Sequence, residues 1–418
     1  MPKKLVVFCD GTWNDLRKEI PTNVVRLAKS VAERAADGSP QIAYYDEGVG
    51  VPSRISWLID QGTKYIGGAL GSGLDQKIED AYRFLVLNFE PEDEIYIFGF
   101  SRGAYTARSL CGLIRKCGIL RRASFTKVPE AVQRYRNNVF PTSPEMVQFR
   151  ADYAYPLATG REDHQRFGVK GTPSDIQREE AGTRKAAYQY RPEGYYRVMF
   201  AGIFDTVGAL GVPTGLDLLR WNRRYKFHDT NASSLLSSIR HAVAANEKRG
   251  LFDVTPYNNL DLLNVQWADA TGWNVDDPAD PRFIPYAHRP YQQRWFPGDH
   301  CSVGGGHSDT GLSSASLLWM AEGARWAGLD FDGDETGELA AAKRADNPFA
   351  PLGQSGFGRT PRGKLRGVGP ANLDEVADPL WRRWMAEAEY RPPNIEVMLG
   401  AAPGARAPDK LPEGFPAA

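Results

Sequence analysis

A serine between two glycines is the residue of this sequence that points most clearly to chemistry. Ser101 is the central residue of the stretch GFSRG, residues 99–103. An apolar run precedes this stretch and a helix-compatible run follows it. A serine at such a strand-to-helix turn has strained dihedral angles, so the residues two before and two after it must be small. Gly99 and Gly103 meet that need. The pattern predicts that Ser101 is a nucleophile, and a structural Gly-Ser turn is the alternative.

A serine hydroxyl needs a histidine base that is oriented by a carboxylate, and in a sheet of this kind they follow in the order Ser, Asp, His. The stretch RVMFAGIFDTVGALG reads as a strand that ends at Asp205. The carboxyl ends of parallel strands share one edge of the sheet, where Ser101 is also expected. We therefore predict that Asp205 is the orienting acid. An aspartate that caps the next turn is the alternative.

Two histidines follow on a glycine-rich loop in QRWFPGDHCSVGGGHSDTGLS. His300 comes four residues after Phe296, at the end of a short strand, and is the favoured base. His307 follows three glycines and remains the alternative. His241 falls in a predicted helix and is expected to be an interior histidine. No histidine or cysteine spacing is typical of a metal site, so neither a metal nor an organic cofactor is expected.

The oxyanion of an acyl-transfer intermediate needs two preorganised N–H donors. The first would be the backbone N–H of Arg102, the residue after the nucleophile. The second would be that of Gly11 or Thr12, in VVFCDGTWND. That same stretch is similar to the D-x-D-G-T motif of haloacid-dehalogenase-type phosphotransferases. Phe8 stands where their nucleophilic aspartate would be, so phosphoryl transfer ranks below ester hydrolysis.

Apolar runs that alternate with helical patterns must position these residues. Together they predict a mostly parallel central sheet with helices on both faces. The expected strands are 5–9, 42–45, 95–98, 198–204, 265–268 and 295–296, and the expected helices are 22–36, 74–88, 104–114, 233–246 and 313–327. A closing apolar stretch, 395–399, is either an edge strand or a segment packed on the core.

We expect residues 1–418 to form a single domain. Residues 121–192 are rich in Arg, Gln, Tyr and Pro and predict an inserted cap. Residues 330–378 predict an irregular surface excursion. The cap aromatics either line an acyl pocket or pack the insertion onto the sheet; they are Phe125, Tyr135, Phe140, Phe149, Tyr153, Tyr155 and Phe167.

The composition excludes some partners. Lys and Arg total 51, as do Asp and Glu, so no net field favours nucleic acid. The N-terminal apolar run is too short for a signal peptide and no run reaches the 18 residues needed to span a membrane, which predicts a chain that is cytoplasmic as synthesised, with export by a secretion machine left open. No segment indicates contact with a membrane, and a protein partner is not specified. The four cysteines are expected to be reduced and mostly structural.

Five separated blocks resemble a known family. FCDGTWN, YYDEGVG, the block from GGALGSG to SLCGLI, GIFDTVGALG and WFPGDHCSVGGGH are similar, in order, to the α/β-hydrolase catalytic domain of the type VI secretion phospholipase effectors and their uncharacterised relatives. The resemblance covers roughly residues 3–330. It implies a lipase-type or esterase fold with Ser101 as nucleophile, Asp205 as acid and His300 as base.

The sequence therefore predicts an α/β-hydrolase fold with an inserted cap. The expected activity is that of a serine hydrolase, which cleaves carboxylic esters, lipid or phospholipid acyl esters among them, through an acyl-enzyme. The alternative is a non-catalytic module with the same fold that binds a lipid or a protein partner.

Overall fold

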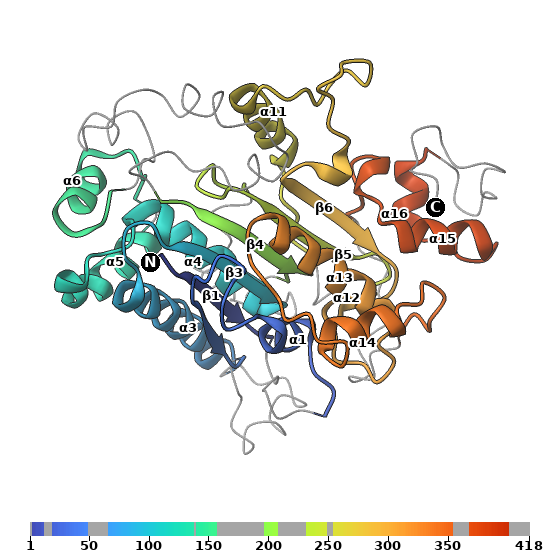
Figure 1. Ribbon diagram of the computed structural model, residues 1–418, viewed down its shortest axis with the longest axis horizontal. Coiled ribbons are helices and arrows are strands. Elements are labelled where there is room, and N and C mark those ends of the chain that lie inside the picture. The colour runs from blue at the N-terminus through green and yellow to red at the C-terminus, as the bar shows by residue number, and fades with distance from the viewer. Residues whose placement is uncertain are drawn as a thin grey trace.

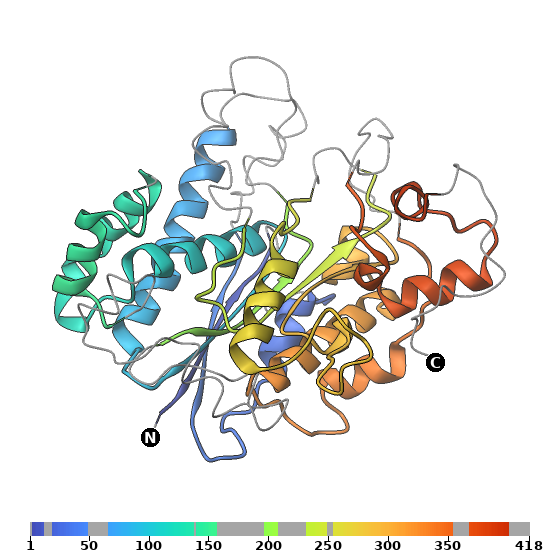
Figure 2. The same cartoon turned by 90° about the horizontal axis from the view of Figure 1, so that it is seen from above.

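A computed structural model describes residues 2–11, 19–48, 66–137, 139–156, 196–207, 231–248, 254–353 and 368–400. Its centre is a parallel sheet of six strands with helices on both faces (Figures 1 and 2). The strands lie in the order β2-β1-β3-β4-β5-β6. Their bounds are β1 (Lys4–Cys9), β2 (Gln41–Asp46), β3 (Glu94–Phe100), β4 (Val198–Phe204), β5 (Ile239–Ala244) and β6 (Tyr291–Phe296). The predicted α/β fold is confirmed.

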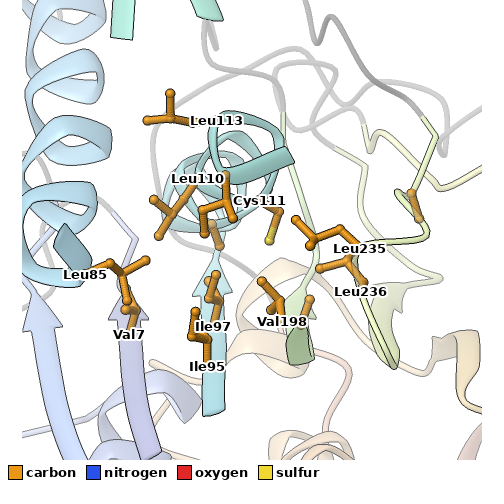
Figure 3. Close-up of a cluster of buried hydrophobic side chains, with 14 of the residues drawn as sticks. Val7, Leu85, Ile95, Ile97, Leu110, Cys111, Leu113, Val198, Leu235 and Leu236 are labelled. Carbon is orange, nitrogen blue, oxygen red and sulfur yellow. The ribbon is translucent and has the colours of Figure 1, made fainter. Parts of the chain in front are cut away.

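Helices cover both faces of the sheet, so the central strands are buried on both sides and read as continuous apolar runs. One face carries α3 (Ile66–Asn88), α4 (Arg102–Cys117), α5 (Val128–Arg136), α6 (Pro144–Tyr153) and α11 (Leu260–Thr271). Figure 3 shows the core under α4, where Leu110 and Cys111 lie over Ile97 of β3 and Val198 of β4. This packing fixes the start of α4 against the carboxyl end of β3.

The opposite face carries α1 (Asn23–Ser30), α12 (His300–Gly304), α13 (Gly311–Trp326) and α14 (Glu338–Ala345). Two more helices, α15 (Asp378–Ala386) and α16 (Pro393–Met398), pack a tryptophan-rich cluster against β6 at the edge of the sheet (Figure 1). Three short 3-10 helices complete the described elements: η1 (Arg122–Lys127), η3 (Tyr286–His288) and η4 (Leu373–Glu375). None of the helices described is long and apolar enough to cross a membrane.

The order of the strands places a topological switch point between β1 and β3. From β1 the chain first adds β2 on one side, and then adds β3 on the other. Connections diverge at such a point and leave a crevice at the carboxyl ends of the two strands. Gly11 follows β1 there and Ser101 follows β3, so the predicted nucleophile and the loop after β1 lie at the same edge of the sheet.

Two predictions of local structure are wrong. The helix expected at 233–246 is instead strand β5, whose polar residues Arg240 and His241 are buried and paired rather than solvated. The strand expected at 265–268 lies in α11, where Leu260, Leu263 and Trp267 recur at helical spacing and face the core. Of the two alternatives for residues 395–399, packing on the core holds, because they belong largely to α16 and Ile395 is buried in the cluster beside β6.

The described part of the predicted cap, residues 121–156 without Asn138, consists of η1, α5 and α6. It packs at the end of α4 that is distant from Ser101. Arg150 of α6 donates a hydrogen bond to the carbonyl of Lys116 at 2.7 Å, and Tyr135 of α5 lies beside Gly112. At about 1.5 Å per residue, Lys116 lies about 20 Å along the helix from its start. These residues therefore do not line a pocket at Ser101.

The aromatic side chains of this region pack the insertion onto the core. Phe149 belongs to the buried cluster on the α4 face, and Phe125, Tyr135, Tyr153 and Tyr155 pack against that cluster. Phe140 is exposed, and Phe167 lies outside the described residues. Phe149, Phe125, Tyr135, Tyr153 and Tyr155 therefore pack the insertion onto the core, which is the second of the two roles predicted for the cap aromatics. The expected irregular segment 330–378 contains the regular helix α14, and its residues 354–367 lie outside the described part.

Candidate active site

Ser101 lies at a sharp turn between β3 and α4. Its dihedral angles are φ 59° and ψ −122°, a conformation that L-residues rarely adopt. A Cβ atom at Gly99 would lie 2.5 Å from the carbonyl oxygen of Gly103, and one at Gly103 would lie 2.1 Å from that of Cys9. Both glycines are thus required by the close passage of backbones, as the sequence pattern predicts for a nucleophile turn.

Asp205 follows β4, the strand next to β3, and is completely buried. Its N–H donates to the carbonyl of Ala242 at 2.7 Å, and its Oδ1 accepts from the N–H of Ala244 at 2.9 Å. The N–H of Ser101 donates to the carbonyl of Phe204 at 3.2 Å, which ties the serine turn to the residue before the aspartate. Asp205 has a φ of 37°, so it is also held in a strained conformation.

His300 is the first residue of α12 and is buried. Its Nδ1 lies 2.6 Å from Oδ2 of Asp205. Its ring contacts the ring of Phe100, the residue before Ser101, with 4.6 Å between the centroids. The structure therefore brings Asp205 and His300 into a direct hydrogen bond beside the serine turn. A proton on Nδ1, donated to the carboxylate, leaves Nε2 as an acceptor.

His307 has a different partner. Its Nε2 lies 3.1 Å from Oδ1 of Asp299, the residue that caps α12 through the N–H of Ser302. Burial alone would raise the pKa of Asp299, but hydrogen bonds from His307 and Ser302 lower it to about 2. His307 thus supports the turn that precedes His300.

The described part of the stretch predicted to supply the second oxyanion donor, up to Gly11, lies beside the serine turn. Cys9 of β1 pairs with Gly99 of β3, which brings the loop after β1 beside the serine turn. The N–H of Gly11, however, donates to Oδ1 of Asp10 at 2.6 Å. This bond assigns the amide to the protein rather than to a substrate and argues against Gly11 as a donor. Thr12 lies outside the described residues, so its role remains a prediction.

Asp10 is a residue that the sequence analysis did not single out. It is buried, and its Oδ2 accepts from the hydroxyls of Thr22 at 2.7 Å and Tyr45 at 2.8 Å. Thr22 caps α1 and also forms a β-bridge with Gly305, just after the helix that begins with His300. Asp10 therefore connects the loop after β1 to the segment that carries His300. An aspartate directly after a buried strand was the signal available for it.

Glu247 is a second residue that the sequence analysis missed. It lies after β5, is buried, and accepts the backbone N–H of His300 on Oε2 at 3.1 Å. Its neighbour Asn246 accepts the N–H of Gly298 on Oδ1 at 2.8 Å. The incorrect helix prediction for 233–246 hid both residues, because it did not place them at the carboxyl edge of the sheet.

His241 is an interior histidine, as expected, although it lies on a strand. It is fully buried on β5, with Nδ1 2.9 Å from Oε1 of Gln293 and Nε2 3.3 Å from the hydroxyl of Thr206. His241 therefore helps to hold Thr206, the residue after Asp205, in place. Within the described ranges, no three His, Cys, Asp or Glu side chains gather as a metal site, and all four cysteines are free thiols.

Arg102, the residue after the serine, carries a positive charge into this region. Its side chain is half-buried, and burial lowers the pKa of its guanidinium to about 10. In the part of the chain that the structure describes, this guanidinium donates no hydrogen bond and forms no ion pair. A desolvated cation of this kind is stabilised by an anionic ligand.

The chain matches a protein-family model described as the catalytic domain of Tle1-like phospholipase effectors of the type VI secretion system. The family model matches residues 3–323. A curated relative, the uncharacterized protein YEL023C of Saccharomyces cerevisiae, is 28% identical over 257 residues, which are 60% of this chain and 32% of that protein.

Two solved structures are similar at lower identity. One is an uncharacterized protein from Pseudomonas aeruginosa, with 19% identity and a TM-score of 0.37, covering 79% of this chain and 47% of that one. The other is the Tle1 effector bound to the VgrG spike of a type VI secretion system, with 16% identity and a TM-score of 0.32, covering 74% of this chain and 52% of that one. The chain thus spans about a third to a half of the length of these relatives.

Proposed function

The chain belongs to the Tle1-like phospholipase effector catalytic domain family, and we propose on that premise and on its geometry that it is a serine hydrolase of phospholipid acyl esters. Family membership supports lipase or phospholipase activity. The observation that carries the assignment to serine chemistry is the 2.6 Å contact between Asp205 and His300, beside the strained turn of Ser101. Two separate strand ends and a helix start converge there, which a structural Gly-Ser turn would not need.

In the proposed reaction His300 Nε2 takes the proton from the Ser101 hydroxyl as the oxygen attacks the ester carbonyl. Asp205 keeps the imidazole in the tautomer with the proton on Nδ1 and stabilises the imidazolium that forms. The same proton then passes to the leaving alcohol oxygen, which leaves an acyl-enzyme. Water, activated by His300, releases the carboxylic acid and restores Ser101.

The backbone N–H of Arg102 is the proposed first oxyanion donor. It belongs to the first turn of α4, whose N–H groups lack partners within the helix. The macrodipole of α4 adds positive potential at the same point. Because the N–H of Gly11 is already bonded to Asp10, Thr12 is the remaining candidate for the second donor.

The guanidinium of Arg102 supports an anionic substrate. A phospholipid presents a phosphodiester a few bonds from its acyl esters, and a half-buried arginine next to the nucleophile, with no ion pair among the described residues, suits such a group. The non-catalytic alternative leaves the hydrogen bond between Asp205 and His300 without a purpose, and we rank it second.

The decisive experiment uses a fluorophosphonate probe and two esters on the full chain. The wild-type protein should react with the probe, and Ser101→Ala should not. Hydrolysis of a phosphatidylglycerol vesicle and of p-nitrophenyl butyrate should both be lost in Ser101→Ala. Labelling of Ser101→Ala as strong as that of the wild type would place the reactive nucleophile elsewhere, and no labelling of either protein would leave the binding module as the better account.

Arg102→Met tests the substrate class separately. Loss of a charge-assisted hydrogen bond costs about 2 kcal/mol, or about thirtyfold in kcat/KM, for the anionic ester. The neutral p-nitrophenyl ester should change by less than about threefold, because the backbone N–H remains. Equal losses on both esters would show that Arg102 shapes the serine turn and does not select an anion.

A further inference from the structure

A cavity of about 420 Å³ lies at the β6 side of the molecule. This volume falls within the range of about 300–1,000 Å³ typical of small-molecule sites. Its walls come from β6, α13, α14 and the start of α15, elements that Figure 1 shows grouped on one side of the sheet. None of the proposed catalytic residues lines it.

Arg294 of β6 contributes a polar side chain to the cavity. It lines the cavity, and its Nε is buried without a hydrogen-bond partner. Among the residues described, the Arg294 side chain donates no hydrogen bond and forms no ion pair; its guanidinium lies 5.8 Å from the ring of Tyr286. Burial lowers the pKa of Arg294, and the cation of Arg240 adds to this shift. The neighbouring Tyr286 and the carboxylates of Asp374 and Glu322 oppose it. A cation desolvated in this way is stabilised by an anion that enters the cavity.

Two further cations line the same cavity. Arg325 of α13 stacks on the ring of Phe331, and Lys343 of α14 is exposed at the rim. Neither forms an ion pair within the described part of the chain. Together with Arg294 they give the cavity three cationic side chains that no carboxylate neutralises directly.

Two of the three carboxylates that line the cavity form ion pairs with arginines outside the lining. Glu322 lies 3.0 Å from the guanidinium of Arg240, and Asp378 lies 2.7 Å from that of Arg382. Asp346 is the third acid of the lining, and burial raises its pKa.

The remaining lining is apolar. Phe296 and Trp319 contact each other with 5.4 Å between their ring centroids, and Ala315, Leu318 and Pro379 complete the surface. An apolar ligand group that is buried against this lining gains about 25 cal/mol of binding free energy for each Å² of apolar surface removed from water. The combination suits a ligand with an anionic head and an apolar body.

We propose that this cavity binds a small organic anion, a carboxylate or a phosphate monoester with an apolar group, with its head on Arg294. The ligand's oxyanion accepts hydrogen bonds from the free guanidinium N–H groups, and Lys343 and Arg325 attract it at the rim. Its apolar part rests on Trp319 and Leu318. The site is separate from Ser101 and holds for either of the two accounts of the catalytic centre.

The experiment is calorimetric titration of the full chain with hexanoate and with phenyl phosphate, using hexanol as the uncharged probe. Saturable binding of at least one anion and none of hexanol is expected. Arg294→Met should weaken the anion about tenfold or more, since it loses a charge-assisted hydrogen bond. Lys343→Ala, at an exposed position that does not threaten folding, should weaken it about two- to threefold.

Two controls separate this cavity from the rest of the molecule. Arg344→Ala removes a neighbouring cation of α14 that does not line the cavity, and Arg102→Met removes the cation beside Ser101. Arg344→Ala should leave the affinity unchanged, and Arg102→Met reports separately any anion that binds beside Ser101. No saturable binding of either anion, an affinity lowered by Arg102→Met but not by Lys343→Ala, or equal binding of hexanol would each overturn the proposal. Should Arg294→Met fail to fold, Lys343→Ala and Arg325→Ala together still decide it.

Discussion

The turns that carry Ser101 and Asp205 are held by backbone geometry, whereas the turn that carries His300 is held by side-chain hydrogen bonds. Ser101 and Asp205 both have positive φ angles, and the glycines around the serine admit no Cβ atom. His300 is fixed instead by the carboxylates of Asp205 and Glu247. The turns of Ser101 and Asp205 should therefore tolerate no substitution that adds side-chain volume. The turn of His300 should tolerate changes of volume but not the loss of a hydrogen-bond partner.

Asp205 takes part in both regions, so its substitution should have the largest effect. Asp205→Asn keeps the volume but replaces the acceptor of the His300 Nδ1 proton, which favours the wrong tautomer of the imidazole. We expect kcat to fall about 10⁴-fold. Steady-state kinetics on a soluble ester measures it. Asp299→Asn is the matched control, since asparagine also caps helices well, and should lower kcat less than about tenfold. Comparable losses in the two variants would contradict the role of Asp205.

Gly103→Ala tests the region held by backbone geometry. The added Cβ would lie 2.1 Å from the carbonyl of Cys9 and 2.5 Å from that of Asp10, so the backbones must move apart. We expect the free energy of unfolding to fall by about 3 kcal/mol and ester hydrolysis to be lost with it. Urea unfolding followed by circular dichroism measures the first quantity.

Gly306→Ala is the matched glycine control for that variant. Gly306 has a φ of 102°, but a Cβ there meets nothing within 4 Å. It should cost only the conformational penalty of about 1 kcal/mol. If both glycine variants lose equal stability, close backbone contact at Gly103 is not what holds the serine turn.

Glu247 tests the region held by hydrogen bonds. Glu247→Ala leaves the N–H of His300 without its acceptor and should lower kcat about thirtyfold, with KM nearly unchanged, because the base is displaced and substrate contacts are not. Glu247→Gln keeps an oxygen acceptor and should recover most of that loss. A rise in KM, or no recovery by glutamine, would indicate that Glu247 contributes in some other way.

The sequence was enough to predict the turns held by backbone geometry. It was not enough to predict the side-chain hydrogen bonds that hold the turn of His300. The spacing of Gly99, Ser101 and Gly103 is enough to predict a turn in which only glycine fits on either side of the serine. Asp205 stands at the end of a long apolar run that predicts a strand. Glu247 could not be placed, because Arg240 and His241 interrupt the apolar run of β5 and made it resemble a helix. Their partners, Glu322 and Gln293, lie far along the chain.

The oxyanion loop and the cap show two other limits. That Gly11 donates to Asp10 depends on one side-chain rotamer, which no spacing reveals. The distance of the described cap aromatics from Ser101 follows from the length of α4 and the end at which α6 attaches. Both are properties of packing rather than of local sequence.

The smallest expected effect concerns Glu375, which lies under β6, the strand that leads to His300. Burial raises the pKa of Glu375 to about 7, and its carboxylate accepts the N–H of Ala371 at 2.8 Å. An acid whose pKa is higher in the folded state keeps its proton there, so stability is greatest below its usual pKa and falls as pH rises from about 4.5 to about 7. Glutamine has no proton to lose, so Glu375→Gln should match the wild type at pH 4 and be more stable by about 1–2 kcal/mol at pH 8, the full shift being reduced by partial solvation. Thermal unfolding of both proteins across this range measures the difference. A constant difference at every pH would mean that Glu375 does not titrate there, and that the hydrogen-bonded side of the site is no more sensitive to pH than the strained side.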